Sequence, residues 1–251
     1  LGSNHMVTSV AWTFSTADVA ESSSDLAHKA ALDGAPTGTG FLVGEQTAGR
    51  GRRGRTWLSP QGGMYLSVVL RPEMDKRHWP LLSFVAALAA RETIDHVLVS
   101  HQPKVKWPND ILVDGRKICG ILLEGMSDAL IVGTGINVAP IQAINLMPNH
   151  ISPTSLVDLG DDVMTPSLLA AAYMNNLARR YDEFSKTGFI PVRKEWMRHA
   201  AFLNEDVSVI GNGLSGHFVG IDDDGSMMLV DASGKTHHIT TGDVVLMGDN
   251  S

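Results

Sequence analysis

Four arginines and three glycines alternate in one short stretch, Gly49-Arg50-Gly51-Arg52-Arg53-Gly54-Arg55, with Trp57 two residues beyond. Arginine presents planar, paired donors to phosphate or carboxylate, and glycine lets backbone amides approach an anion closely. Because neighbouring like charges repel, we expect the empty loop to be mobile and an anionic ligand to order it, with Trp57 closing over a flat ring. A solvated basic turn and an RNA-binding tract remain open alternatives.

A second group of cations precedes a turn. Lys104 and Lys106 alternate with Val105 and Trp107, so a strand would place the two lysines on one face, and Pro108-Asn109-Asp110 would then turn the chain. A lysine in a cleft stabilises charge that develops on phosphorus during adenylyl or phosphoryl transfer. Two surface lysines beside a core tryptophan are an equally open interpretation.

Three further features favour structural roles when taken singly. The segment Gly133-Thr134-Gly135-Ile136-Asn137 matches neither the dinucleotide-binding fingerprint nor the phosphate-binding P-loop, so it indicates tight strand packing. Cys119 is expected to be a small buried side chain. Glu124 is expected to be a solvated strand end rather than a ligand for a hydroxyl group.

Composition excludes several classes of protein. The 251 residues have a net charge of −7, and 43% of them are hydrophobic, which argues against disorder and against a surface that is basic throughout. A single cysteine precludes an internal disulfide and a multi-thiolate metal site, and no HExxH pattern occurs, so we predict no protein-bound metal. No apolar run approaches the roughly 18 residues of a membrane span, and we see no signal segment, so we expect a cytoplasmic protein. Residues 1–6 resemble an expression-tag remnant.

The elements that must position these groups follow from periodicity and turn residues. Ser22 and Asp25 predict a helix start, and Asp114-Gly115 predicts a hairpin turn. Beyond residue 198 short strands alternate with Gly/Asp/Asn turns, which is typical of a small barrel or sandwich of about fifty residues. We therefore predict an α/β body over residues 7–200 and an all-β domain over 201–251. The body's helices are expected from residue 23, at 80–97 and at 168–186, and its strands at 41–43, 64–70, 105–113, 118–123 and 130–138.

Taken together, these segments resemble the biotin protein ligases. The resemblance covers about residues 12–247, in the family's order and spacing. The matching segments are 46–57 (QTAGRGRRGRTW), 62–67 (GGMYLS), 106–110 (KWPND), 116–122 (RKICGIL), 133–138 (GTGINV) and 154–156 (TSL).

The resemblance implies a catalytic domain with a mixed sheet, of the class II aminoacyl-tRNA-synthetase-like biotin–lipoate ligase type, followed by an SH3-like barrel. It implies formation of biotinyl-5′-AMP from biotin and ATP, with Mg²⁺ arriving with ATP, and transfer of biotin to a lysine of a biotin carboxyl carrier protein. The implied catalytic residues are Lys106 and Arg50. The implied biotin-binding residues are Ser22, Ser23, Ser24, Gln46, Gly49, Arg50, Gly51, Arg52, Lys106 and Gly120. The implied ATP- or adenylate-binding residues are Arg52, Arg55, Trp57, Lys106, Asn109 and Asn137, and residues 140–154 are implied to form a mobile loop over the adenylate.

One departure and several alternatives accompany the resemblance. Family members commonly have Ser-Thr-Asn where this chain has Ser22-Ser23-Ser24, which predicts weaker biotin binding or a shifted ligand preference. A lipoate or octanoate ligase of the same superfamily is the nearest alternative, but its usual RRxSGGG segment is missing. The second alternative is a non-catalytic protein that binds RNA or another anion. With no winged-helix segment before Trp12, we expect a short form without DNA binding; a monomer and a homodimer both remain open.

Overall fold

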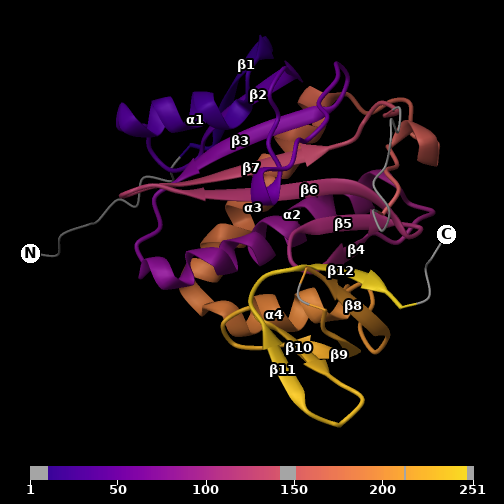
Figure 1. Ribbon diagram of the computed structural model, residues 1–251. Helices are drawn as coiled ribbons and strands as arrows, with labels where there is room; N and C mark the ends of the chain where they lie inside the picture. The colour runs from indigo at the N-terminus through magenta and orange to yellow at the C-terminus, as the bar shows by residue number, and fades with distance from the viewer. Residues whose placement is uncertain (1–10, 142–150, 212, 248–251) are drawn as a thin grey trace, which may run out of the picture.

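A computed structural model describes residues 11–141, 151–211 and 213–247 of the chain. The described chain forms a seven-stranded sheet in its N-terminal part and a separate five-stranded sheet in its C-terminal part (Figure 1). The predicted α/β body followed by a small all-β domain is confirmed. The domain boundary at residues 200 and 201 stays a prediction.

The large sheet is mixed. Its spatial order is β1-β2-β3-β7-β6-β5-β4; β1 and β2 are parallel, and all other neighbouring strands are antiparallel. Helix α1 connects the two parallel strands, because a parallel pair needs a crossover. The strands are β1 (Thr13–Ala20), β2 (Thr39–Gln46), β3 (Met64–Leu70), β4 (Lys104–Lys106), β5 (Asp110–Val113), β6 (Arg116–Gly125) and β7 (Leu130–Ile136). The helices are α1 (Ser23–Leu32), α2 (Leu82–Val97), α3 (Pro166–Thr187) and α4 (Phe189–Arg198).

Strand β3 shows how the sheet separates two layers of side chains. Leu66 and Val68 belong to the main core with α2 and α3, whereas Val69 packs with Ala27 and Ala31 of α1 on the other face. This follows from the two-residue period of a strand, and it places odd-numbered β3 residues on the α1 face. The α1 face is only partly covered by one short helix, which leaves room there for a ligand.

Local sequence signals fix two of the connections. The side chain of Ser22 accepts a hydrogen bond from the Ser24 amide at 3.2 Å and so caps α1, as predicted. Asp114 and Gly115 both have positive φ, at 50° and 74°, and form the predicted tight turn between β5 and β6.

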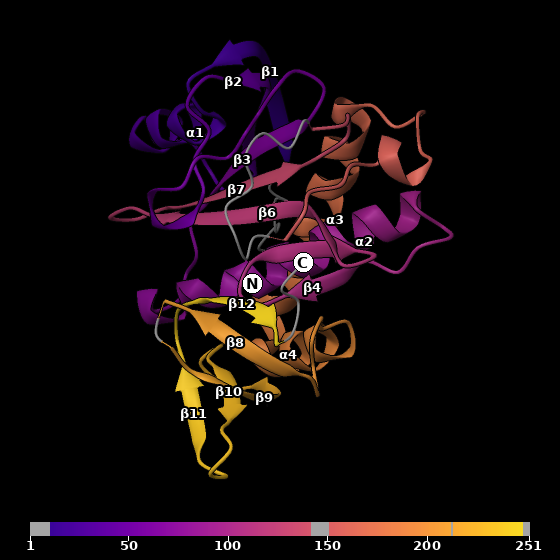
Figure 2. The same cartoon turned by 45° about the vertical axis from the view of Figure 1, so that its right-hand side comes forward.

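The C-terminal sheet has the order β11-β10-β9-β8-β12 and lies against the end of the body that contains β4 and α4 (Figure 2). The Trp107 indole donates to the Gly225 carbonyl at 3.0 Å across this boundary, and Arg193 pairs with Asp223. These contacts orient the barrel relative to the catalytic sheet. Its strands are β8 (Asp206–Ile210), β9 (Ser215–Ile221), β10 (Met227–Val230), β11 (Thr236–Ile239) and β12 (Asp243–Leu246).

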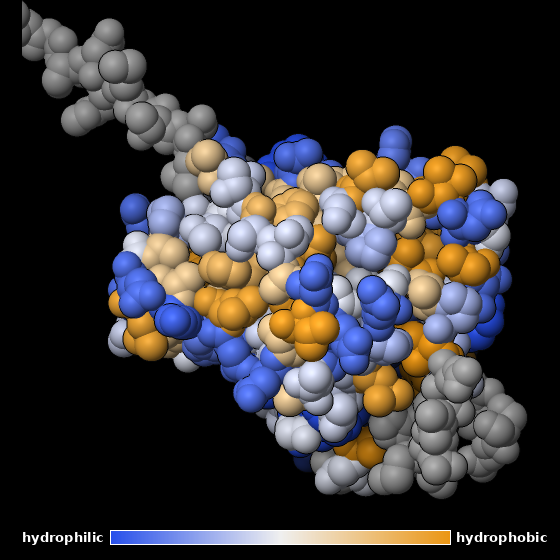
Figure 3. All heavy atoms as spheres, turned by 90° about the horizontal axis from the view of Figure 1, so that it is seen from above, coloured by the Kyte–Doolittle hydropathy of each residue, from blue (hydrophilic) through white to orange (hydrophobic). Residues whose placement is uncertain are grey.

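Strand β11 of the C-terminal domain and two elements of the α/β body, β1 and α4, were absent from the sequence prediction. Strand β1 has polar residues at four of its eight positions, is mostly exposed and lies at the sheet edge, so it lacks the apolar pattern of an interior strand. Helix α4 buries only Val192 and Trp196, four residues apart, directly after Gly188 ends α3 at φ 73°. In the part of the chain that the structure describes, no helix has the length and hydropathy that crossing a bilayer requires. Seen from above, apolar side chains are interspersed with polar and charged ones (Figure 3).

Candidate functional site

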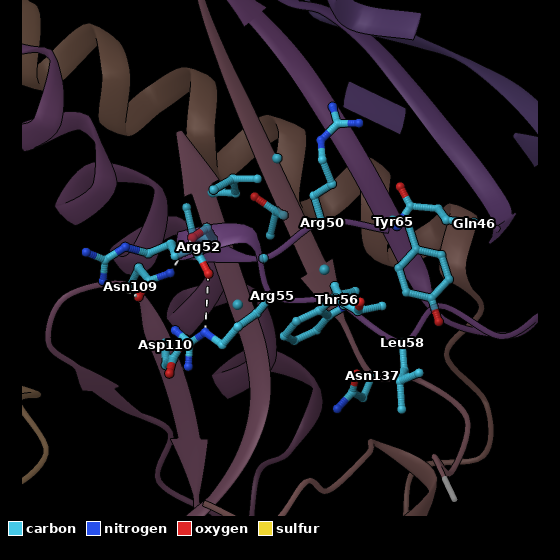
Figure 4. Close-up of a pocket in the computed structure, with 18 of the residues that line it drawn as sticks. Gln46, Arg50, Arg52, Arg55, Thr56, Leu58, Tyr65, Asn109, Asp110 and Asn137 are labelled. Carbon is cyan, nitrogen blue, oxygen red and sulfur yellow. Dashed lines mark hydrogen bonds between the residues drawn. The ribbon is translucent and has the colours of Figure 1, made fainter. Parts of the chain in front are cut away.

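A cavity of about 220 Å³ lies over the α1 face of the large sheet, below the arginine-rich loop. Gln46 and Tyr65 lie at one end of it, and Arg52, Asn109 and Asp110 at the other (Figure 4). Twelve residues predicted to bind biotin or adenylate line it: Ser22, Ser23, Ser24, Gln46, Arg50, Gly51, Arg52, Arg55, Trp57, Asn109, Gly120 and Asn137. The structure thus brings together segments from residue 22 to residue 137.

The cavity floor consists of glycines on adjacent strands. Gly120 of β6 lies directly opposite Gly135 of β7, and the indole of Trp57 packs onto both. A β-carbon at Gly120 would lie 2.7 Å from Trp57 Cζ3, so no larger residue fits there without moving the indole. Trp57 Nε1 is buried and has no hydrogen-bond partner among the described residues. The repeated glycines therefore serve close packing of an aromatic side chain, not a nucleotide fingerprint.

Hydroxyl groups and one amide form the neutral end of the cavity. Ser67 Oγ lies 2.8 Å from Ser23 Oγ and 3.1 Å from Ser24 Oγ, and the Ser23 amide donates to Gln46 Oε1 at 2.8 Å. Ser67 is fully buried. Ser22, Ser23 and Ser24 thus both begin α1 and line the cavity. Sequence reasoning missed Ser67, although its odd position on β3 was a signal that it shares the α1 face.

The arginine loop is folded back on itself and paired with carboxylates from three elements. The Gly51 amide donates to the Arg55 carbonyl at 2.7 Å, closing the loop. Arg50 lies 2.8 Å from Asp25 of α1 and 3.4 Å from Glu124 of β6. The hydrogen bond that Arg50 donates to the Asp25 carboxylate is the main cause of a raised pKa for Arg50. Acidic partners therefore offset part of the repulsion among the arginines.

Glu124 corrects one expectation. We expected a solvated strand end, but the side chain is 24% exposed and lies between Arg50 and His28, with its second oxygen 3.8 Å from His28 Nε2. Alternation along β6 turns Glu124 toward the α1 face, where the arginine loop supplies the opposite charge. Cys119, one residue before the glycine floor, is fully buried as expected.

The arginine loop also contacts the C-terminal domain. Arg55 forms an ion pair with Asp243 of β12 at 2.9 Å, and Arg52 and Arg53 donate to Thr241 at 3.4 and 3.2 Å. Sequence reasoning did not anticipate these contacts because the partners are almost 190 residues apart. The barrel thereby helps to orient the loop over the cavity.

Lys106 occupies a different place from the one expected. It is only 4% exposed, it is not among the residues that line the cavity, and its Nζ lies 3.7 Å from Asp110 Oδ2. Burial lowers the pKa of Lys106, and the nearby Asp110 carboxylate opposes that effect. Lys117, which was not predicted, does line the cavity and lies 2.7 Å from Asp110 Oδ1.

The other predicted residues have well-defined partners. Asn137 Nδ2 donates to the Thr154 carbonyl at 2.9 Å, while its Oδ1 is buried without a partner among the described residues. Asn109 accepts from Arg52 at 3.3 Å. Gly49 does not line the cavity; a β-carbon there would lie 2.4 Å from the Trp57 carbonyl, so it shapes the loop. Most of the predicted adenylate-covering segment, residues 142–150, lies outside the described residues.

The site offers donors and cations rather than a metal cage. Within the described ranges, no group of three or more His, Cys, Asp or Glu side chains is placed to hold a metal ion. The cavity can bind a ligand with a neutral polar head at the serine end and negative charge at the arginine and lysine end.

Comparison with known proteins points to one family. The model of the Biotin/lipoate A/B protein ligase family matches residues 18–139, and that of the biotin protein ligase C-terminal domain matches residues 202–247. A biotin–[acetyl-CoA-carboxylase] ligase of Paracoccus denitrificans is 36% identical over 207 residues, which cover 77% of this chain and 85% of the relative. The bifunctional ligase/repressor BirA of Bacillus subtilis (strain 168) is 33% identical over 222 residues, covering 84% and 67%. Among solved structures, a biotin protein ligase from Aquifex aeolicus in complex with biotin and ATP superimposes with a TM-score of 0.80 and 26% identity, over 93% of this chain and 98% of that one.

Proposed function

This chain belongs to the biotin/lipoate A/B protein ligase family, and we propose that its cavity condenses biotin with ATP and presents the product to a carrier lysine. It is an ATP-dependent ligase of the biotin–[acetyl-CoA-carboxylase] ligase type, with biotin and ATP as its substrates. Mg²⁺ enters as the partner of ATP, since this ion is commonly held through substrate phosphates rather than by an all-protein site.

The observation that carries this proposal is the polarity of the cavity. Its neutral end, with Ser23, Ser24 and Gln46, suits the ureido ring of biotin, which has both a carbonyl acceptor and N–H donors. Its cationic end, with Arg52 and Lys117, suits the biotin carboxylate and the triphosphate of ATP.

In the first half-reaction the cations do two things. They offset the repulsion between a carboxylate and a triphosphate, and they stabilise the charge that develops at the α-phosphate while the adenylyl group is transferred and pyrophosphate leaves. Trp57 lies beside this end, where an adenine ring can stack on it. In the second half-reaction a lysine amine of a biotin carboxyl carrier domain attacks the mixed anhydride, AMP leaves, and no residue of this chain is covalently modified.

The serine end also bears on the nearest alternative. A lipoyl or octanoyl chain has no hydrogen-bonding head, so it would leave the buried hydroxyls of Ser23, Ser24 and Ser67 without a ligand partner. We therefore favour biotin over lipoate or octanoate. The match to a ligase family also argues against a non-catalytic RNA-binding protein.

The test is mass spectrometry of a purified biotin carrier domain incubated with this protein, MgATP and biotin, with lipoate or octanoate in place of biotin in parallel. We expect a mass gain of one biotinyl group and none with the other acids. If the carrier stays unmodified while a control biotin ligase modifies it, the proposal is wrong.

A further inference from the structure

Arg50 is held by two carboxylates that come from different elements of the fold. Its Nη2 lies 2.8 Å from Asp25 Oδ1 on α1 and 3.4 Å from Glu124 Oε1 on β6. Arg50 lines the cavity, whereas neither carboxylate is among the lining residues. In Figure 4 the guanidinium of Arg50 points away from Arg52 and Asn109 at the cationic end. The protein's own carboxylates therefore decide where this cation points.

The charges around Arg50 leave it no net positive charge to offer a ligand. Two carboxylates face one guanidinium, and the next ionisable side chain, His28, is charged only when it is protonated. Glu124 Oε2 is buried, lies 3.8 Å from His28 Nε2 and has no hydrogen-bond partner among the described residues. With His28 neutral, this group of side chains is negative overall. An anion that approaches Arg50 must therefore displace at least one carboxylate, because like charges brought together are unfavourable.

We propose that Asp25 and Glu124 are positioning residues that set the affinity of the cavity for the carboxylate of its ligand, by competing with that carboxylate for Arg50. This inference rests on the proposed function. A ligand whose neutral head lies at the serine end places its carboxylate along the arginine loop. Contacts from Arg50 to that carboxylate replace contacts to Asp25 or Glu124, since a guanidinium binds carboxylates in its own plane through a small number of N–H donors. The competition weakens binding of the charged acid and leaves binding of an uncharged analogue unchanged.

Both carboxylates can be neutralised without dismantling the elements that bear them. The side-chain cap of α1 is Ser22, which accepts from the Ser24 amide, and not Asp25. Glu124 is held on β6 by the pairing of its backbone opposite Ile131 of β7. Asp25→Asn and Glu124→Gln keep the size of the side chain and remove its negative charge.

Glu45→Gln is the matched control. Burial and, after it, the nearby Glu45 carboxylate raise the pKa of Tyr65, which lines the cavity, so the charge of Glu45 is felt there. In the described part of the chain Glu45 has no ion-pair partner. Its removal therefore measures direct repulsion of an anion without any change at Arg50.

The experiment measures, by calorimetry without ATP, the affinity for biotin and for biotin amide, which has the same ureido ring but no charge. We expect Asp25→Asn and Glu124→Gln each to tighten biotin binding about three- to fivefold, the ratio that corresponds to one partly exposed ion pair. Binding of biotin amide should stay within about twofold of wild type in both variants. Glu45→Gln should leave both affinities unchanged.

An unchanged or weaker affinity for biotin in both variants would overturn the inference. A gain of the same size in Glu45→Gln would also overturn it, because that result indicates plain repulsion, as would an equal gain for biotin amide. If Asp25→Asn alone loses affinity for both ligands, the start of α1 has been disturbed, and Glu124→Gln on β6 then decides the question. A wild-type protein that binds no biotin would contradict the proposed function instead.

Discussion

A β-carbon placed on Gly135 would lie 2.6 Å from Nε1 of Trp57, closer than real side-chain contacts allow. The indole of the arginine loop and the backbone of β7 are thus fitted to each other. Through Trp57, the arginine loop therefore contacts the floor of the substrate cavity. The same loop also contacts the C-terminal barrel.

Gly135→Ala is expected to displace Trp57 while β7 keeps its pairing, since alanine is compatible with a strand. We expect kcat/KM for carrier biotinylation to fall at least about tenfold, because small displacements of positioning groups are costly in catalysis. Gly125→Ala is the control, since a β-carbon there would meet Trp79 only at 4.0 Å. Equal kcat/KM for the two variants would show that this packing is dispensable.

Lys106→Met should strongly slow the formation of biotinyl-5′-AMP while the fold is retained. Methionine occupies similar volume, and Asp110 keeps its closer partner, Lys117 at 2.7 Å. We expect pyrophosphate release to drop by about a hundredfold or more. Circular dichroism checks the fold. Normal pyrophosphate release would contradict the predicted role of Lys106.

Ser24→Asn is expected to tighten biotin binding. The amide adds a second donor or acceptor at the serine end, where Ser24 has only a hydroxyl bonded to Ser67 at 3.1 Å. We expect a gain of about tenfold, the effect of one net hydrogen bond, by calorimetry. Ser208→Asn in the barrel is the control. If the wild type binds biotin with micromolar or tighter affinity and Ser24→Asn leaves that affinity unchanged, Ser22, Ser23 and Ser24 already give biotin binding of ordinary strength.

Asp243→Asn tests whether the barrel orients the arginine loop without contributing much to the stability of the protein. The Arg55–Asp243 pair is partly exposed, at 43% and 19%, so its loss should change the free energy of unfolding by only about 0–1 kcal/mol. Because Arg55 is then released from the barrel, the KM for ATP should rise several-fold. Asp223→Asn, which removes a second interdomain ion pair, the one with Arg193, should leave the KM for ATP unchanged. A KM shift of the same size in both variants would indicate a general loosening of the domain interface.

Much of this protein could be predicted from local patterns. The cap at Ser22, the turn at Asp114-Gly115 and the nearly continuous apolar run of β3 are decided by near neighbours in the chain, so residue type and turn chemistry were enough to predict them. The arginine loop and the Lys106–Asp110 segment indicated anion chemistry for the same reason.

The tertiary structure alone decided which groups meet. The only sequence signal for Ser67 is its odd-numbered position on β3, which places it on the α1 face. Its hydroxyl nevertheless hydrogen-bonds with those of Ser23 and Ser24, because β3 passes beneath the start of α1. Lys117 lines the cavity and Lys106 lies behind it because Asp110 on β5, which pairs with both β4 and β6, separates them. Glu124 and Asp243 pair with arginines from which they are distant in sequence. Local sequence specifies which chemical groups are available and which face of a strand they occupy; their distances, burial and charge partners depend on long-range strand order and domain packing, which no local pattern encodes.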